Sequence, residues 1–262
     1  MILSNENYYS TDTNKEYLSV SQYKSFCKCE AATMAELRGE WVRPKTTALL
    51  VGSYVDSWFE GTLSEFTSEN PEIFKRDGSL KSDYVQAEEI IKRVQMDELF
   101  MSYMSGEKQR IFNSPLFGVP WKIKVDSLLP DKIVDLKVMR SMDRVMGKSF
   151  VEHWGYDLQM AVYAAVVKEV TGKDLETYLA VVTKQTPPDL EVIEIPKWRR
   201  EEILYDVEKR TPRIMQVKSG QVEPERCGVC EYCRATKKLE VPIDFELVGL
   251  SATERKALFG SL

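Results

Sequence analysis

The chain has 262 residues, 43% of them hydrophobic, which is enough for one large domain with a buried core. Its formal net charge of −5 is unlike that of a protein that coats DNA, although local basic patches remain compatible with it. The single histidine, His153, excludes histidine-based catalysis and multi-histidine zinc sites. No apolar run reaches about 18 residues and no leader precedes the polar start, so we expect a cytoplasmic protein without a membrane span.

Helix and strand signals alternate along the chain and predict an α/β fold. Residues 1–18 form a polar N-terminal segment without regular structure. Capping residues and glycines delimit predicted helices at 19–37, 46–60, 82–99, 149–170 and 199–218, with a loop at 62–82. Alternating apolar residues predict strands at 109–117, 177–184 and 190–195 and a hairpin within 120–139, followed by a connector at 140–148.

The hairpin is the most informative segment. Its arms, 122–126 and 133–138, both alternate, and the turn residues 129–132 join them. Folding the chain between Pro130 and Asp131 places Asp126 opposite Asp135, and Lys124 opposite Lys137. Residues two apart share a face, so Asp126, Asp135 and Lys137 project from one side. The other side faces a core and carries Val125, Val134, Leu136 and Val138.

Carboxylates that oppose each other across a hairpin repel, and a divalent cation between them removes that cost. Hard oxygen ligands suit Mg²⁺ or Mn²⁺, so Asp126 and Asp135 are candidate metal ligands beside Lys137. The alternative is an ordinary solvated polar face. Asp131 at the turn tip points away from this face, and we exclude it as a ligand.

Three groups of cations are candidate phosphate contacts, with plain solvated charge as the alternative for each. They are Lys122 with Lys124, Lys137 with Arg140 and Arg144, and Arg234 with Lys237 and Lys238.

Five cysteines in an intracellular chain argue against a disulfide scaffold. Cys227, Cys230 and Cys233 are separated by two residues each, a spacing seen in iron–sulfur sites. A fourth ligand would come from Cys27 or Cys29. A [4Fe–4S] cluster, a structural Zn²⁺ ion and unligated thiols all remain open.

Four local motifs occur in an order that resembles the PD-(D/E)xK nuclease superfamily, in its RecB-like and RecE-like (exodeoxyribonuclease VIII) branch. The first is Gly52 followed four residues later by Asp56, where the family more often has a metal-binding histidine. The second is Asp126, and the third is Asp135-Leu136-Lys137. The fourth is a glutamine followed four residues later by a tyrosine, Gln159 and Tyr163, on the helix after the lysine-bearing strand.

The resemblance implies a restriction-endonuclease-like core, in which helices flank a central mixed β-sheet. It places this domain at 19–240, with a cysteine-rich staple at 227–233 and a C-terminal tail at 241–262. It also favours Cys29 over Cys27 as the cysteine that joins Cys227, Cys230 and Cys233 around an iron–sulfur cluster.

The implied activity is that of a metal-dependent deoxyribonuclease, an exonuclease that processes linear double-stranded DNA in recombination or phage DNA processing. Asp56, Asp126, Asp135 and the Leu136 carbonyl would bind the cation, and Lys137 would orient or deprotonate a water molecule. Gln159 and Tyr163 would contact DNA, with a polar helix edge as the alternative. The resemblance also implies a single-strand annealing protein as partner and assembly of the chain into a homo-oligomer. The alternative function is a catalytically inert module that binds DNA or protein.

Overall fold

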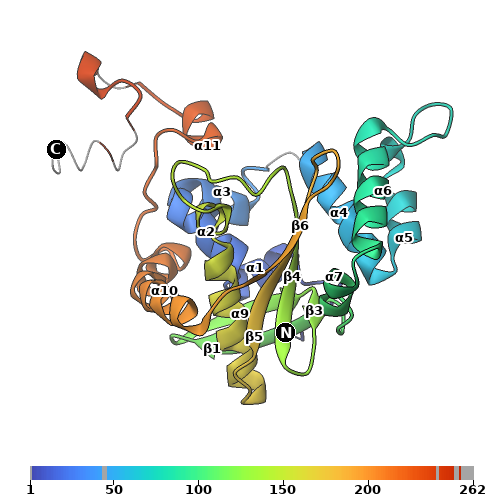
Figure 1. The fold of residues 1–262 in the computed structure, drawn as a ribbon. Coiled ribbons are helices and arrows are strands. Elements are labelled where there is room, and N and C mark those ends of the chain that lie inside the picture. The colour runs from blue at the N-terminus through green and yellow to red at the C-terminus, as the bar shows by residue number, and fades with distance from the viewer. Residues whose placement is uncertain (1, 43–45, 240–241, 251–253, 255–262) are drawn as a thin grey trace. The chain divides into compact units, whose positions relative to one another are not determined.

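Figure 1 shows the helices and strands of the chain in a computed structural model, which describes residues 2–42, 46–239, 242–250 and 254. The chain divides into two units, one formed by Pro44–Asp206 and the other by Met1–Arg43 together with Val207–Leu262. The smaller unit therefore combines the two ends of the chain. Among the described residues, none of the helices has the length and apolar character that a membrane crossing requires.

Two sheets form the centre of the larger unit. In the first, β1 (Arg110–Leu116) pairs antiparallel with β2 (Val119–Val125). The second has the order β3-β4-β5-β6, with bounds Ser127–Leu128, Lys132–Met139, Glu176–Thr183 and Leu190–Glu194. Because β4 and β5 run parallel and the outer pairs run antiparallel, this sheet is mixed. The predicted α/β fold with a mixed sheet is confirmed.

The register of the predicted hairpin is confirmed. Ser127 pairs with Val134 and Leu128 with Ile133, as expected from a turn centred between Pro130 and Asp131. The predicted length of its first arm was wrong, because Lys124 pairs with Ile111 of β1 and does not lie opposite Lys137 in a ladder. The short connection between β1 and β2 keeps β1 beside β2. Asp126 therefore occupies the junction where the chain leaves one sheet and enters the other.

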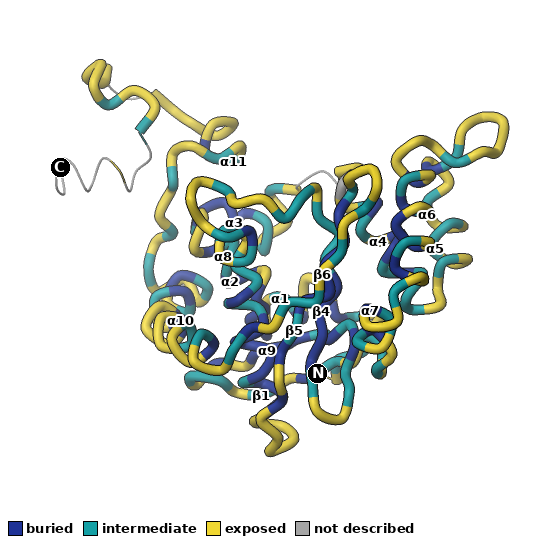
Figure 2. The backbone as a smooth tube through the Cα atoms, in the orientation of Figure 1, coloured by how far each residue is buried: buried dark blue, intermediate teal, exposed yellow. Residues whose placement is uncertain are grey.

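Helices cover both faces of the four-stranded sheet. α4 (Thr47–Glu60), α6 (Ser82–Gln95) and α7 (Glu98–Tyr103) pack on one face, where they bury alternate residues of β4 and β5. These residues are Val134, Leu136, Ala180 and Val182. α9 (Tyr156–Thr171) contacts strands of both sheets. Buried positions concentrate along these central elements (Figure 2).

Two helices predicted to be continuous are interrupted. The helix predicted at 149–170 divides at Gly155 (φ 63°) into α8 (Phe150–Trp154) and α9. The helix predicted at 82–99 ends at Gln95, because the Asp97 side chain caps the separate helix α7.

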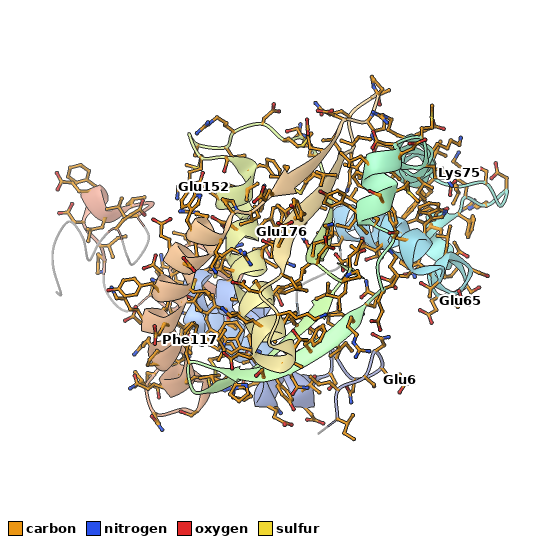
Figure 3. The ribbon with its side chains drawn as sticks, turned by 60° about the horizontal axis from the view of Figure 1, so that its bottom comes forward. Glu6, Glu65, Lys75, Phe117, Glu152 and Glu176 are labelled. Carbon is orange, nitrogen blue, oxygen red and sulfur yellow. The ribbon has the colours of Figure 1, made fainter. Side chains whose placement is uncertain are left out.

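The segment 62–82 is not a simple loop. It contains α5 (Leu63–Glu69) and the 3₁₀ turn η1 (Pro71–Ile73). Apolar side chains explain why this segment is regularly structured, since Ile73 is fully buried and Phe66 packs edge-on against Tyr54 of α4. The charged side chains of Glu65 and Lys75 point outward (Figure 3).

Close backbone packing holds β3 in place. The Gly106 N–H donates to Ser127 Oγ (2.9 Å), and that hydroxyl donates to the Tyr103 carbonyl (2.9 Å). A Cβ atom at position 106 would lie 2.5 Å from the carbonyl oxygen of Leu128. Only glycine fits this contact, which lies directly after Asp126 in the sheet.

The smaller unit is helical. It contains α1 (Thr11–Glu16), α2 (Val20–Lys28), α3 (Glu30–Arg38), the part of α10 (Lys197–Lys218) from Val207 onward, α11 (Glu231–Ala235) and η2 (Phe245–Leu247). The prediction that 1–18 lacks regular structure was wrong. Ser10 caps α1, and Tyr8, Tyr17 and Leu18 are buried around it. Of the predicted tail at 241–262, residues 241, 251–253 and 255–262 lie outside the described part.

The helix predicted at 19–37 is also interrupted, at Cys29. This residue is extended (φ −165°) and stands between the end of α2 and the start of α3. The interruption therefore falls on one of the predicted cysteine ligands.

Candidate active site and cysteine cluster

Asp135 and Lys137 lie two residues apart on β4 and form an ion pair. Asp135 is only 2% exposed. Its Oδ1 accepts a hydrogen bond of 2.7 Å from Gln159 Nε2 on α9, and its Oδ2 faces the Lys137 ammonium. The side chain of Lys137 keeps 17% of its surface exposed. The pair is thus recessed, but solvent reaches it through the lysine.

Asp126 is held from two sides at the junction between the sheets. Its Oδ2 accepts the Leu136 backbone N–H (2.9 Å), and its Oδ1 accepts Gln109 Nε2 (3.3 Å). These bonds fix the carboxylate next to β4, where it interacts electrostatically with Asp135. The predicted opposition of the two acids is therefore present.

The third acid, Asp56, comes from α4. Burial raises the pKa of Asp56 to about 7; the Lys137 ammonium opposes this shift, and the carboxylates of Glu60 and Asp135 add to it. Burial, with the neighbouring carboxylates of Asp135 and Asp56, also raises the pKa of Asp126 well above its usual range. Three carboxylates from three segments thus form one electrostatically coupled cluster, which we call the acidic cluster.

Lys137 faces this cluster as a cation. Burial acts to lower the pKa of Lys137, but the carboxylates of Asp135 and Asp126 outweigh it and the pKa is raised. Its Nζ also lies 4.9 Å from the ring centroid of Tyr156, whose hydroxyl donates to Met139 Sδ (3.0 Å). The ammonium is therefore enclosed by two acids and an aromatic face.

The other predicted residues divide into three groups. Gln159 reaches Asp135 directly, and Tyr163 lies one turn further along α9 with only 8% of its surface exposed. Asp131 is exposed at the turn and pairs with Lys132 (2.8 Å), in keeping with its exclusion as a ligand. The backbone N–H of Leu136 donates a hydrogen bond to Asp126. Metal binding by the Leu136 carbonyl oxygen stays a prediction.

The prediction that Lys122 belongs to a surface basic stretch was wrong. It is 1% exposed, and burial lowers its pKa to about 8. The alternation of 122–126 does not reveal this, because it does not show which elements pack against β2, and α9 is one of them. Among the described residues, the stretch around Lys124 therefore lacks its expected second cation.

Sequence reasoning missed Gln109 and Lys108. Gln109 precedes β1 with a positive φ of 52° and donates to Asp126. Burial lowers the pKa of Lys108, and the charge of Asp126 opposes that shift. Continuing the register in which Arg110 pairs with Val125 puts Gln109 opposite Asp126. Correct pairing of the first two strands is thus the signal that would have found it.

The donor set of the acidic cluster fits a divalent cation. Ionising these neighbouring carboxylates is costly, since burial together with their mutual repulsion raises the pKa of Asp56 and of Asp126 even with the Lys137 ammonium beside them. Asp135 Oδ2 is buried and accepts no hydrogen bond from the described residues apart from its ion pair with Lys137. A hard cation held by these oxygens would relieve both features.

Comparison with known families identifies the domain. Residues 19–236 match the model of the family described as "PDDEXK-like domain of unknown function (DUF3799)". The chain belongs to this PDDEXK-like family. The predicted PD-(D/E)xK resemblance is therefore confirmed, and the matched range includes the acidic cluster.

One solved structure is similar over nearly the whole PDDEXK-like chain. It is a crystal structure from Eubacterium rectale described as a "Putative exonuclease". The two chains share 49% sequence identity with a TM-score of 0.91, over 95% of this chain and 99% of the other. No curated protein sequence matches the chain significantly.

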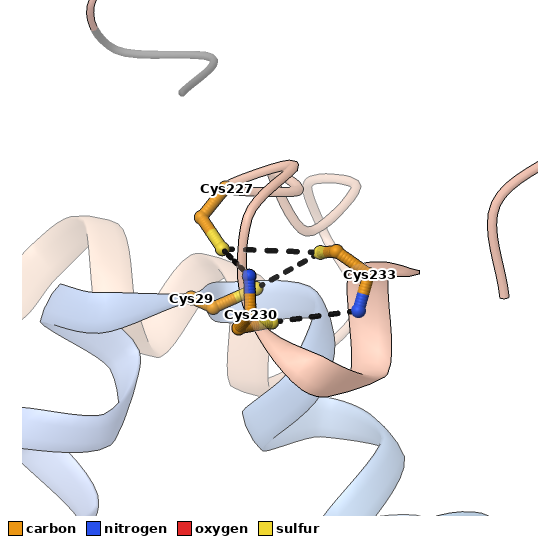
Figure 4. A group of neighbouring side chains, drawn as sticks. All are labelled: Cys29, Cys227, Cys230 and Cys233. Atoms are coloured by element: carbon orange, nitrogen blue, oxygen red, sulfur yellow. Dashed lines mark hydrogen bonds between the residues drawn. The ribbon is translucent and has the colours of Figure 1, made fainter. Parts of the chain in front are cut away.

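A second candidate site in the PDDEXK-like protein is a cluster of cysteines in the smaller unit (Figure 4). The sulfur atoms of Cys29, Cys227, Cys230 and Cys233 all lie within 4.8 Å of one another. Cys27, the other candidate for the fourth ligand, is exposed and outside this group. We call these four residues the cysteine cluster.

Backbone amides surround the sulfur atoms. The Cys230 N–H donates to Cys227 Sγ (3.4 Å) and the Cys233 N–H donates to Cys230 Sγ (3.4 Å). Burial acts to raise the pKa of Cys227, but the N–H groups of Val229 and Cys230 lower it to about 7. Cys227 therefore has the thiolate character that metal binding needs, whereas burial raises the pKa of Cys29 and of Cys230.

Proposed function

We propose that this PDDEXK-like protein is a divalent-cation-dependent exodeoxyribonuclease that hydrolyses linear double-stranded DNA in recombination or phage DNA processing. The observation that carries the proposal is the acidic cluster with Lys137 beside it. Membership of the family supports a nuclease, and the name of the similar protein from Eubacterium rectale supports the exonuclease mode.

Asp56, Asp126, Asp135 and the Leu136 carbonyl would hold Mg²⁺ or Mn²⁺. When bound, such a cation lowers the pKa of water and polarises a phosphate. The chain's own contribution begins with Gln109 and Gln159, whose amides orient Asp126 and Asp135. Oriented carboxylates avoid a reorganisation cost during the reaction.

Lys137 would act on the phosphate and on the attacking water. Its ammonium can donate to the water oxygen and offset the charge that develops on the phosphate oxygens. The Tyr156 ring and the Asp135 carboxylate restrict where this ammonium can lie. Tyr163, further along α9, would support the DNA side of the site through its phenol.

A cavity of about 1080 Å³ in the larger unit supports a binding site for the DNA end. Tyr156 lines this cavity, and the same ring lies 4.9 Å from Lys137 Nζ beside the acidic cluster. Other lining residues include Trp154, Arg140 and Lys184 as well as the acids Asp83 and Asp143. Aromatic rings stack on bases and cations attract phosphates, which suits a short single-stranded end.

The decisive experiment compares linear and circular double-stranded DNA with Mg²⁺ or Mn²⁺. We expect degradation of linear DNA alone, loss of at least a hundredfold in rate for Asp135→Asn and for Lys137→Ala, and no metal-free activity. Asp131→Asn and Lys132→Ala are matched controls on the same hairpin, because both side chains pair with each other at the turn.

Other outcomes lead to other functions. Cleavage of the circular substrate would assign an endonuclease. If the folded, metal-loaded protein bound DNA but degraded none, the inert binding module would replace the enzyme. Co-purification with a single-strand annealing protein and the molar mass in solution would test the partners and the homo-oligomer that the resemblance implies.

A further inference from the structure

The sulfur atoms of the cysteine cluster converge on one small volume, and two pairs of them are in hydrogen-bond contact. Cys29 Sγ is 3.6 Å from Cys233 Sγ, and Cys227 Sγ is 3.9 Å from Cys233 Sγ. All four cysteines are free, so no disulfide accounts for this approach. Neutral thiols can share hydrogens at these distances, whereas four thiolates held this close together need a cation between them.

These separations are those of four ligands around one ion. Zinc binds thiolates at about 2.3 Å in tetrahedral geometry, which places neighbouring sulfurs about 3.8 Å apart. The distances of 3.6 Å between Cys29 and Cys233 and 3.9 Å between Cys227 and Cys233 lie on either side of that value.

A [4Fe–4S] cluster does not fit the same arrangement. Each thiolate of such a cluster binds a different iron, and the cubane of iron and sulfide occupies the space between the four ligands. Here all four sulfur atoms lie within 4.8 Å of one another, with two pairs in contact, which leaves no volume for the cubane. The iron–sulfur cofactor that the resemblance implies therefore disagrees with the spacing of these residues.

The surroundings also suit a small, negatively charged metal–thiolate centre. Two backbone N–H groups donate to Cys227 and Cys230, and such bonds disperse thiolate charge. The guanidinium of Arg226 binds the Cys233 carbonyl (3.2 Å), and that of Arg234 binds the Val229 carbonyl (3.0 Å). Both cations thus lie on the cysteine-bearing segment, where they offset the excess charge of four thiolates on one dication.

We propose that Cys29, Cys227, Cys230 and Cys233 bind a single tetrahedral Zn²⁺ ion that joins the two ends of the chain. Cys29 and Cys233 are 204 residues apart in sequence, so the ion would close a very long loop. Closing such a loop limits the unfolded chain most, which makes the role structural. The inference does not depend on the nuclease proposal.

The test starts with protein purified without exposure to oxygen, so that an oxygen-sensitive cluster is not lost. We expect a colourless sample with one zinc per chain that depends on the cysteine cluster, and no iron or acid-labile sulfide. Exchange with Co²⁺ should give the visible bands of tetrahedral cobalt–thiolate. X-ray absorption at the zinc edge should show sulfur ligands only.

Matched cysteine variants separate this site from the acidic cluster. Cys29→Ser should lose one equivalent of zinc and have a lower Tm. Cys27→Ser, two residues away, should keep both the zinc content and the Tm of the wild type. A brown protein with four irons and four sulfides per chain would overturn the proposal. So would a folded wild-type protein that takes up neither Zn²⁺ nor Co²⁺, or whose zinc is unchanged in Cys29→Ser.

Discussion

Gln159 Nε2 donates a hydrogen bond of 2.7 Å to Asp135 Oδ1, and this contact ties α9 to the most deeply buried acid of the acidic cluster. Because the acceptor is buried, its loss cannot be replaced fully by water. The same bond selects one orientation of the carboxylate.

We expect Gln159→Ala to reduce the rate of DNA hydrolysis at least tenfold and to destabilise the fold by about 1–3 kcal/mol. Single-turnover kinetics and chemical denaturation check the two effects. Gln95→Ala, on the exposed end of α6, is the control and should change neither. Unchanged kinetics in Gln159→Ala would mean that Asp135 needs no help to hold its orientation.

The raised pKa of Asp56 predicts how the metal-free protein responds to pH. An acid whose pKa is about 7 in the folded protein and roughly 4 when unfolded stabilises the fold only while it is protonated. This contribution is complete below about pH 4 and is lost as the pH rises through about 7.

We therefore expect that, in chelator, Asp56→Asn raises Tm at pH 8 and has much less effect at pH 5. Thermal melts of the wild type and the variant across this range measure the difference. Added Mg²⁺ should stabilise the wild type at pH 8 and the variant less. Parallel melting curves for the two proteins at every pH would contradict the coupling of Asp56 to the acidic cluster.

The position of Trp154 predicts that it contributes more to DNA binding than Trp198, another exposed tryptophan. Trp154 is 46% exposed and lines the cavity beside Tyr156, whereas Trp198 is 67% exposed and is not among the residues lining that cavity. Stacking of one base on an aromatic ring is worth about 1–3 kcal/mol. Trp154→Ala should therefore weaken binding of single-stranded DNA ends roughly tenfold.

The measurement is fluorescence anisotropy in an Asp135→Asn background, which keeps the DNA intact. Trp198→Ala should bind as tightly as the parent. Equal losses for both substitutions, or none for either, would remove the cavity as the path of the DNA end.

The ion pair between Glu30 and Arg213 predicts a stability change within the smaller unit. Arg213 donates to Glu30 through Nε (3.0 Å) and Nη2 (2.8 Å), and the Glu225 N–H adds a third bond (2.8 Å). Burial acts to raise the pKa of Glu30, but the bonds from Arg213 and Glu225 outweigh it and the pKa is lowered. A lowered pKa means stability that is present at neutral pH and lost on acidification through that pKa.

We expect Arg213→Ala to cost about 1 kcal/mol at pH 7, since Arg213 is partly exposed and solvent screens the pair. The cost should shrink in acid, when Glu30 is protonated. Denaturation at both pH values tests this, with Glu208→Ala on the exposed side of α10 as control. A cost that stays the same in acid would assign the effect of Arg213 to packing.

Local signals in the sequence were sufficient for the hairpin register and for the approximate position of most strands. Turn chemistry at Pro130 and Asp131 set the register that brings Asp126 toward Asp135. Helix α4 and its end at Gly61 followed from capping residues alone. The interruption at Cys29 was not predictable in this way, because an extended residue within a helical pattern depends on packing that only the folded chain supplies.

The same reason explains the other errors. Lys122 alternates like a surface residue, but it is 1% exposed in the folded chain, where α9 packs against β2. Gln109 approaches Asp126 through the pairing of two strands whose partnership the sequence pattern did not reveal. Residues supplied by a neighbouring element are the ones that local periodicity cannot find.

The tight contact at Gly106 makes this position intolerant to mutation for a steric reason. An added methyl group would collide with the backbone of Leu128, and backbone cannot rotate away as a side chain can. The displacement would pass along β3 to the junction residue Asp126. In a saturation-mutagenesis screen for DNA degradation, position 106 should therefore be as depleted of substitutions as Asp135, although glycine supplies no chemical group to the reaction.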